Sequence, residues 1–219
     1  MDLSGYLPVW DQLSGAQRER LLQHTARRSV RRGTVVHNGG EECTGLLMVE
    51  SGQFRAYILS PEGREITLYR LFEGDLCLLS ASCMMRSLQF DITVEAERDT
   101  SFLLIPAEAY KAVMEESSPL ANFTNEVMAA RFSEVMWLLE QVLWRRFDQR
   151  LAAFLLEESA IESSSCLKLT HEAIGSHLGS PREVVTRMLR YFQNEGMVKL
   201  SRGSVEITDE KRLRALEGS

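Results

Sequence analysis

The stretch from residue 169 to 208 constrains the fold more than any other part of the sequence. It reads LTHEAIGSHLGSPREVVTRMLRYFQNEGMVKLSRGSVEIT. Thr170 can cap a short helix that ends at Gly179, and Ser180 with Glu183 has the S-x-x-E spacing of a capping box for a second helix. Because two helices joined by a short turn containing glycine form a helix-turn-helix, this motif is the first prediction.

A β-hairpin is predicted directly after the second helix, which we expect to end near Gly196. Two short apolar segments, Val198–Leu200 and Val205–Ile207, flank the turn residues Ser201-Arg202-Gly203-Ser204. Such a hairpin behind a helix-turn-helix is a wing. The helix, the glycine turn and the wing agree with one another, so the whole segment favours a winged helix-turn-helix.

The second helix carries polar residues at i, i+3, i+4 and i+7 on one face and apolar residues on the other. A solvated helix face has the same pattern, but the neighbouring elements favour a recognition helix, whose first turns meet base edges in the major groove. Arg reads guanine and Glu accepts from cytosine. We expect base contacts from Arg182, Glu183, Thr186 and Arg187. Phosphate contacts are expected from Thr170, His171, Ser180, Lys199 and Arg202.

Residues 29–105 alternate short β-rich segments with glycine and turn signals, which argues for a β-sandwich or barrel. The predicted strands are Thr34–His37, Leu46–Glu50, Phe54–Leu59, Glu65–Arg70, Ile92–Glu97 and Ser101–Ile105. A short helix is expected before them, within residues 1–27, where Ser14 and Gln17 have the spacing of a capping box.

A long helix is predicted from Ser118 to about Trp144, with apolar content that rises towards its end. A helix that is apolar nearly all round is buried on more than one side. One side can pack on the β-rich domain, and a second copy of the chain can cover the other; burial within one domain is the alternative. Because a helix-turn-helix pairs across a palindrome, we favour the homodimer. Dimer contacts are expected from Val135, Leu138, Leu139 and Val142.

The string SPREVVTRMLRYFQNEGMV resembles the recognition-helix region of the Crp/Fnr transcription regulators. Arg182, Glu183 and Arg187 fall on the base-reading positions of the Crp branch, and Thr186 stands where Fnr-type proteins use Ser. The order of glycines in RRGTVVHNGGEE, SGQFRAYILSPEGREITLYRLFEGD and TVEAERD is similar to the cyclic-nucleotide-binding-type β-roll of this family. The resemblance covers almost the whole chain.

Together these features predict an α+β chain in three parts. Residues 1–117 form a helix and an antiparallel, jelly-roll-like β-roll sensor domain, residues 118–146 a dimerisation helix and hinge, and residues 147–219 a winged helix-turn-helix. The resemblance implies a homodimeric, sequence-specific transcription regulator that binds an inverted repeat in double-stranded DNA and works with RNA polymerase. An unidentified effector or redox signal at the β-roll would control it. The alternative is a constitutive DNA-binding regulator whose β-roll is only a scaffold.

The charge distribution agrees with a DNA-binding end on an acidic body. Residues 166–219 carry 9 Lys/Arg against 7 Asp/Glu, and residues 1–165 carry 16 against 24, out of totals of 25 and 31. The chain has neither an apolar run near the ~20 residues of a membrane span nor a secretion signal, so a cytoplasmic protein is expected. An enzyme is not expected, because a cupin-like metal site needs several ligands and His37 is the only histidine in residues 29–105.

Two cofactors known from the family are not expected. In the cyclic-AMP-binding members a Glu holds the ribose and an Arg the phosphate; Leu79 stands here in the place of that Glu, and Phe90 and Asp91 in the places of Arg and Ser. A phosphate cannot lie against Asp and Phe without a large desolvation cost. The iron–sulfur members carry an N-terminal Cys cluster, whereas residues 1–30 contain no Cys.

The segment CLLSASCMM, residues 77–85, lies beside the expected pocket. A buried short helix with small residues and soft core side chains is one interpretation. An apolar or aromatic effector, a thiol switch or haem are the others. The effector is left unknown, and no metal site or catalytic residue is assigned. The candidate pocket residues are Cys77, Leu79, Ser80, Ser82, Cys83, Arg86 and Phe90.

Overall fold

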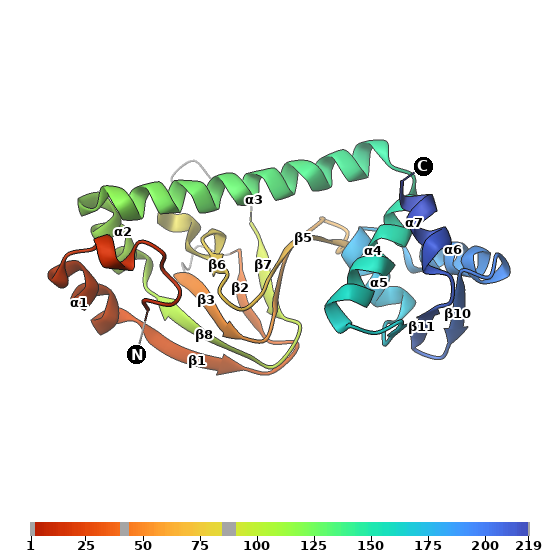
Figure 1. The fold of residues 1–219 in the computed structure, drawn as a ribbon, viewed down its shortest axis with the longest axis horizontal. Helices are drawn as coiled ribbons and strands as arrows, with labels where there is room; N and C mark the ends of the chain where they lie inside the picture. The colour runs from red at the N-terminus through yellow and green to blue at the C-terminus, as the bar shows by residue number, and fades with distance from the viewer. Residues whose placement is uncertain (1–2, 40–43, 85–90, 219) are drawn as a thin grey trace. The chain divides into compact units, whose positions relative to one another are not determined.

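The computed structural model describes residues 3–39, 44–84 and 91–218 (Figure 1). The chain divides into two compact units, of which the first comprises Met1–Ile58 and Leu68–Val135 and the second Leu59–Thr67 and Met136–Ser219. Helix α3, Ser118–Trp144, contributes to both. Within the described residues, no helix is long and apolar enough to cross a membrane.

The first unit begins with a short 3-10 helix, η1 (Trp10–Gln12), and helix α1 (Gly15–His24). The predicted capping box is confirmed: the amide of Gln17 donates to Ser14 Oγ at 3.3 Å, and the amide of Ser14 donates to Gln17 Oε1 at 2.9 Å. Helix α2 (Ala107–Glu116) contacts α1, and Leu21, Tyr110 and Val113 from these two helices are fully buried. The pair therefore closes one end of the first hydrophobic core.

Two antiparallel four-stranded sheets follow α1, which confirms the predicted β-roll. The first sheet has the order β1-β8-β3-β6, built from Ala26–Val30, Thr100–Ile105, Leu46–Ser51 and Leu76–Cys77. The second has the order β2-β7-β4-β5, built from Val35–Asn38, Thr93–Ala96, Phe54–Leu59 and Glu65–Leu71. Side chains from both sheets share one core, in which Phe54 packs edge to face on Phe102 with 5.2 Å between ring centroids.

Strands β1 and β6 were not among the sequence predictions. Strand β1 reads ARRSV and has three exposed residues in a row, so it lacks the apolar alternation of a half-buried strand. Strand β6 spans only two residues, which is too short to produce a pattern. Both are held by pairing with strands far away in the sequence, β8 and β3.

Helix α3 extends over the predicted range. Leu120 and Thr124 near its start are buried, and Thr124 Oγ1 lies 2.9 Å from the hydroxyl oxygen of Tyr110. Phe123, Val127 and Met128 pack against the cores of the first unit. Beyond this part the helix exposes a series of large apolar side chains, namely Phe132, Met136, Trp137, Leu139, Val142, Leu143 and Trp144.

The second unit has the predicted winged helix-turn-helix. Its helices are α4 (Phe147–Glu162), α5 (His171–Leu178), α6 (Arg182–Asn194) and α7 (Glu210–Glu217). A three-stranded sheet of order β10-β11-β9 combines Val198–Ser201, Ser204–Ile207 and Cys166–Leu167. All seven elements enclose one apolar core. Helix α4 begins at Phe147, where Gln149 Oε1 accepts the amide of the N-cap Arg146 at 3.0 Å.

Candidate nucleic-acid interface

Helix α5 contacts α6 and is capped as the sequence predicts. Its N-cap Thr170 accepts the amide of Ala173 on Oγ1 at 3.1 Å. The helix ends at Gly179, which has φ of 66° and ψ of 30°, a left-handed conformation that side chains with a Cβ rarely adopt. Ile174 points into the core and is fully buried.

The turn from α5 to α6 depends on Gly175. The amide of Ser180 donates to the carbonyl oxygen of Gly175 at 3.0 Å, which folds the turn back on the helix. A Cβ atom on Gly175 would lie only 2.5 Å from the backbone oxygen of Ser180. Since real Cβ atoms do not come so close to a backbone oxygen, glycine is required for this approach of the two helices.

The start of α6 differs from the prediction. The capping box between Ser180 and Glu183 is wrong: the helix begins at Arg182, its N-cap is Pro181, and no side chain caps it. The carbonyl oxygen of Pro181 instead accepts the amides of Val184 and Val185 at 3.0 and 3.3 Å. Ser180 is therefore a turn residue, because its own amide is already used in the bond to Gly175.

Helix α6 has one buried and one exposed face. Val185, Leu189 and Phe192 are fully buried in the core of the unit and fix the rotation of the helix about its axis. The opposite face forms an open groove lined by Arg182, Glu183, Thr186, Arg187, Arg190, Tyr191 and Asn194. With three arginines against one glutamate, this face has a net positive charge suited to a polyanion.

The structure brings the four predicted base-reading residues together on this exposed face. Arg182, Glu183 and Arg187 are exposed, whereas Thr186 is half-buried and lies 2.9 Å through Oγ1 from Nδ1 of His171. Burial, with the nearby positive charges of Arg182 and Arg190 as smaller causes, lowers the pKa of His171 below 6.5. The lowered pKa favours the neutral imidazole. The base-reading roles of these residues stay predictions.

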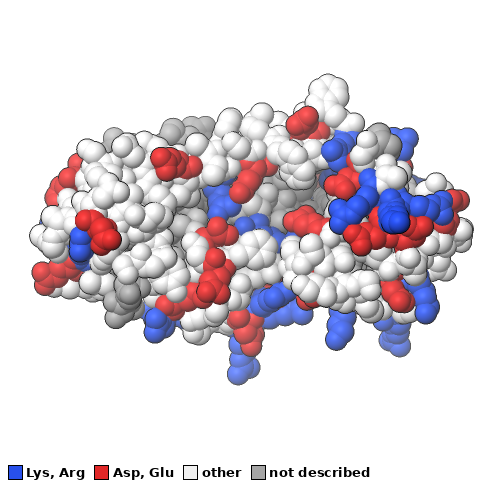
Figure 2. All heavy atoms as spheres, viewed as in Figure 1, with Lys and Arg blue, Asp and Glu red and all other residues white. Residues whose placement is uncertain are grey.

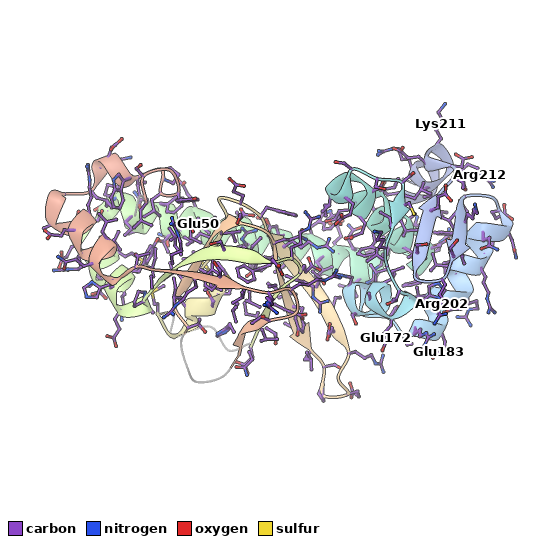
Figure 3. The ribbon with its side chains drawn as sticks, turned by 90° about the horizontal axis from the view of Figure 1, so that it is seen from below. Glu50, Glu172, Glu183, Arg202, Lys211 and Arg212 are labelled. Atoms are coloured by element: carbon purple, nitrogen blue, oxygen red, sulfur yellow. The ribbon has the colours of Figure 1, made fainter. Side chains whose placement is uncertain are left out.

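The residues predicted to contact phosphate lie in three places in the unit: the start of α5, the turn before α6, which holds Ser180, and the wing. Thr170 and His171 lie at the start of α5, where both side chains already have partners within the protein. Lys199 and Arg202 are exposed on the wing, and Lys199 Nζ lies 3.7 Å from Glu206. Figure 3 shows Glu183 and Arg202 at one edge of the unit and Lys211 at the other. In Figure 2, basic side chains project from the lower edge of the C-terminal part, where Figure 1 places β10 and β11.

Three further residues of the groove were not predicted as site residues: Arg190, Tyr191 and Asn194. They follow Arg187 at i+3, i+4 and i+7, so helical spacing alone could have identified them. Tyr191 is 49% exposed despite its large ring, which adds an aromatic surface to the charged face. The groove therefore extends over about three turns of α6 rather than its first turns alone.

Three of the seven candidate pocket residues, Cys77, Leu79 and Ser80, lie within the packing of the β-roll. Cys77 and Leu79 belong to the core shared by the two sheets, and Cys77 is a free thiol. The hydroxyl of Ser80 is buried and bonds the carbonyl oxygens of Gly45 and Cys77 at 2.7 and 3.0 Å. Ser82 and Cys83 lie on the short 3-10 helix Leu79–Met84. Arg86 and Phe90 are outside the described residues. For Leu79 and Ser80 the packing agrees with a buried short helix.

The position that would hold the cyclic AMP ribose is also part of the packing. Leu79 is 4% exposed and Leu78 is 1% exposed, and each belongs to a core cluster of the first unit. Asp91 is exposed and has its Cβ close to Gly39. Among the described residues, no group of three or more His, Cys, Asp or Glu could hold a metal ion.

Both units match domain families of known proteins. Residues 27–117 match the cyclic nucleotide-binding domain family and residues 149–216 match the Crp-like helix-turn-helix domain family. A crystal structure from Eubacterium rectale, described as a transcriptional regulator of the Crp/Fnr family, is similar over 98% of this chain and 99% of its own, with 60% identity and a TM-score of 0.96. The chain belongs to the Crp/Fnr family of transcription regulators.

Relatives from both branches of the family resemble the chain at lower identity. The Cyclic AMP receptor protein of Thermus thermophilus is 24% identical over 202 residues, which cover 92% of this chain and 93% of that protein. The Transcriptional activator protein FnrA of Stutzerimonas stutzeri is 26% identical over 199 residues, covering 87% and 80%. The family consists of DNA-binding regulators, so the expectation of a non-enzymatic protein with a helix-turn-helix is confirmed.

The role of Gly175 in this Crp/Fnr regulator can be tested by adding one methyl group. Gly175→Ala should destabilise the second unit by about 1–3 kcal/mol, because the new Cβ overlaps the backbone oxygen of Ser180. Ser176→Ala, which places the same residue one position further along α5, should stay within about 0.5 kcal/mol. Chemical denaturation measures both. Equal stability of the two variants would contradict the close approach.

Proposed function

We propose that two copies of the chain pair through α3 and read an inverted repeat in DNA with their two α6 helices. The main support is the α6 face, whose exposed arginines and glutamate stand on a buried apolar face that holds the helix in place. A single α6 covers only a few base pairs, and helix-turn-helix proteins reach a full site by binding two half-sites as a dimer. RNA polymerase and a cytoplasmic location are part of the same proposal.

The exposed apolar residues of α3 have the spacing of a coiled-coil seam. Phe132, Met136, Leu139 and Leu143 follow one another at steps of four, three and four residues, which is the a/d repeat. Their exposed fractions are 66%, 45%, 46% and 61%, respectively. Gln141, two residues before Leu143, is buried, so the seam lies on a face of the helix that the chain itself does not cover.

Most of the predicted dimer residues lie on or beside this seam. Leu139 is a member of the seam, and Val142 next to Leu143 is exposed as well. Val135 and Leu138 are half-buried. Val135 flanks the seam, and Leu138 lies further round the helix. A symmetric dimer presents the same surface from both copies, so a self-complementary apolar seam fits a second copy of this chain. Pairing would remove four large side chains per copy from water, each worth about 1.5–3 kcal/mol when fully buried.

The seam predicts a dimer that a single charge disrupts. Leu139→Asp should shift the protein to a monomer, because it places two carboxylates opposite each other in an apolar contact. Ala130→Asp adds the same charge to the same helix at an exposed position away from the seam and should leave the dimer intact. Light scattering gives the mass of each variant. A Leu139→Asp protein that stays dimeric would contradict the pairing.

Substitutions in the second unit should distinguish residues that contact bases from residues that contact phosphates. We expect a TGA-like half-site, repeated as an inverted pair about one helical turn apart, with Arg187 on a guanine and Glu183 on the opposite cytosine. Arg182 should add a further guanine and give a GTGA-type half-site. Arg187→Ala should lose about 1–3 kcal/mol of discrimination at one base pair. Arg202→Ala should weaken all sequences alike and lower the salt slope by about 1.

Selection from random DNA with each protein, followed by titrations at several salt concentrations, measures both effects. Arg202→Ala serves as the matched control, since it also removes one exposed arginine from the same unit. Enriched sites without inverted symmetry, or an unchanged preference after Arg187→Ala, would show that α6 is not the reader.

The β-roll is proposed to respond to a signal other than a cyclic nucleotide. Isothermal calorimetry should detect no binding of cyclic AMP at physiological concentrations, because Leu79 is packed in the core where a ribose-binding carboxylate would be needed. A cyclic-AMP-binding relative measured in parallel gives the positive control. A micromolar dissociation constant for this chain would contradict the interpretation of the pocket.

One observation favours a second form of the function, a constitutive regulator whose β-roll is only a scaffold. Cys77, Leu79 and Ser80 are predicted pocket residues whose side chains take part in the packing of the roll. Packing and internal hydrogen bonds of this kind are what a scaffold requires. An effector-controlled regulator and a constitutive one share the same dimer and the same reading helix.

A further inference from the structure

His171 and Thr186 form a hydrogen bond that joins the first residue of α5 to the middle of α6. Nδ1 of His171 lies 2.9 Å from Oγ1 of Thr186, and both residues are half-buried. Thr186 also lines the outer groove of α6 together with Arg182 and Arg187. It therefore has one side towards α5 and another towards the surface proposed to meet DNA.

The β-carbon of a threonine bears two branches, a hydroxyl and a methyl group. In Thr186 the hydroxyl is directed to His171, and the methyl is the branch without a hydrogen-bonding partner. We infer that His171 is a positioning residue, which holds Thr186 so that its methyl group, rather than its hydroxyl, meets the DNA and selects a thymine. This inference rests on the proposed function, in which α6 enters the major groove.

The chemistry of the major groove supports a thymine. Among the four bases only thymine presents a methyl group there, and a threonine methyl is one of the apolar groups that contact it. Burying one such group contributes about 0.8 kcal/mol. Because 1.4 kcal/mol corresponds to a factor of ten, the expected effect is roughly fourfold in affinity for each half-site.

The hydrogen bond does not depend on a charged imidazole. The pKa of His171 is lowered, first by burial and then by Arg182 and Arg190, which favours the neutral ring. A hydroxyl can donate to one imidazole tautomer and accept from the other. In either case the Thr186 hydroxyl stays directed towards α5.

Replacing thymine by deoxyuridine tests the inference directly, since this change removes only the C5 methyl group. Each thymine of the selected site is replaced in turn, and the affinity of the purified full-length protein is measured for every substituted site. For the unchanged protein we expect one position in each half-site where deoxyuridine weakens binding roughly fourfold.

Four variants then identify the group that makes this contact. Thr186→Val, which has a methyl on both branches, should keep the fourfold loss at that position, and Thr186→Ser, which has none, should abolish it. His171→Ala should reduce the loss because the hydroxyl is released. His171→Asn, whose amide reaches about as far as Nδ1, should restore it. If His171 only contacts a phosphate, its loss weakens binding to the thymine site and to the deoxyuridine site equally. The ratio of the two affinities then stays unchanged.

Each outcome separates the inference from the proposed function. A deoxyuridine effect that persists in Thr186→Ser or disappears in Thr186→Val would overturn the methyl contact. A loss of thermal stability in His171→Ala with an unchanged deoxyuridine ratio would show a structural role only, and would overturn the positioning role. If Arg187→Ala also leaves the selected sequence unchanged, the reading helix itself is wrong; if Arg187→Ala relaxes one base pair as expected, only the inference fails.

Discussion

The close approach of α5 and α6 at Gly175 is the constraint on which the proposed DNA-reading surface depends. With no Cβ at this position, the carbonyl oxygen of Gly175 accepts the amide of Ser180, and the turn closes on itself. Helix α6 then buries Val185 and Leu189 in the same core as Ile174. Burial of one face determines which residues remain outside, so packing in the core sets the array of arginines and glutamate on the surface.

The second constraint is the number of copies of the chain that the proposed DNA site requires. One α6 presents a charged, aromatic face along about three turns, which is enough for one half-site. The α3 seam from Phe132 to Leu143 supplies an apolar surface that the described chain leaves uncovered, and its a/d spacing suits another helix. In the proposed dimer, apolar burial along α3 thus joins two polar reading surfaces into one symmetric protein.

Local signals made much of this fold predictable from the sequence. The caps at Ser14 and Thr170, the glycine turn and the wing hairpin each follow from residues a few positions apart, and all of them are present. The capping box at Ser180 failed because tertiary structure uses the amide of that residue in a bond to Gly175. The spacing of residues along the sequence cannot show which of two possible partners a backbone amide will bind.

Contacts between distant residues could not be predicted. His171 and Thr186 are 15 positions apart on different helices, and no periodicity links them. The segment from Cys77 to Ser80 has the composition of either a pocket or a core, and only the packing of both sheets around it distinguishes them. The two-residue strands β6 and β9 are too short to have a pattern and depend on pairing partners elsewhere in the chain.

The two α6 helices of the proposed dimer read two half-sites from one face of the DNA. Inserting about five base pairs between the half-sites rotates one by roughly half a helical turn and leaves each half-site sequence intact. Fluorescence anisotropy with the original and the lengthened site measures the effect. We predict that the affinity for the lengthened site falls to that for a single half-site. An unchanged affinity would contradict the symmetric dimer as the reading unit.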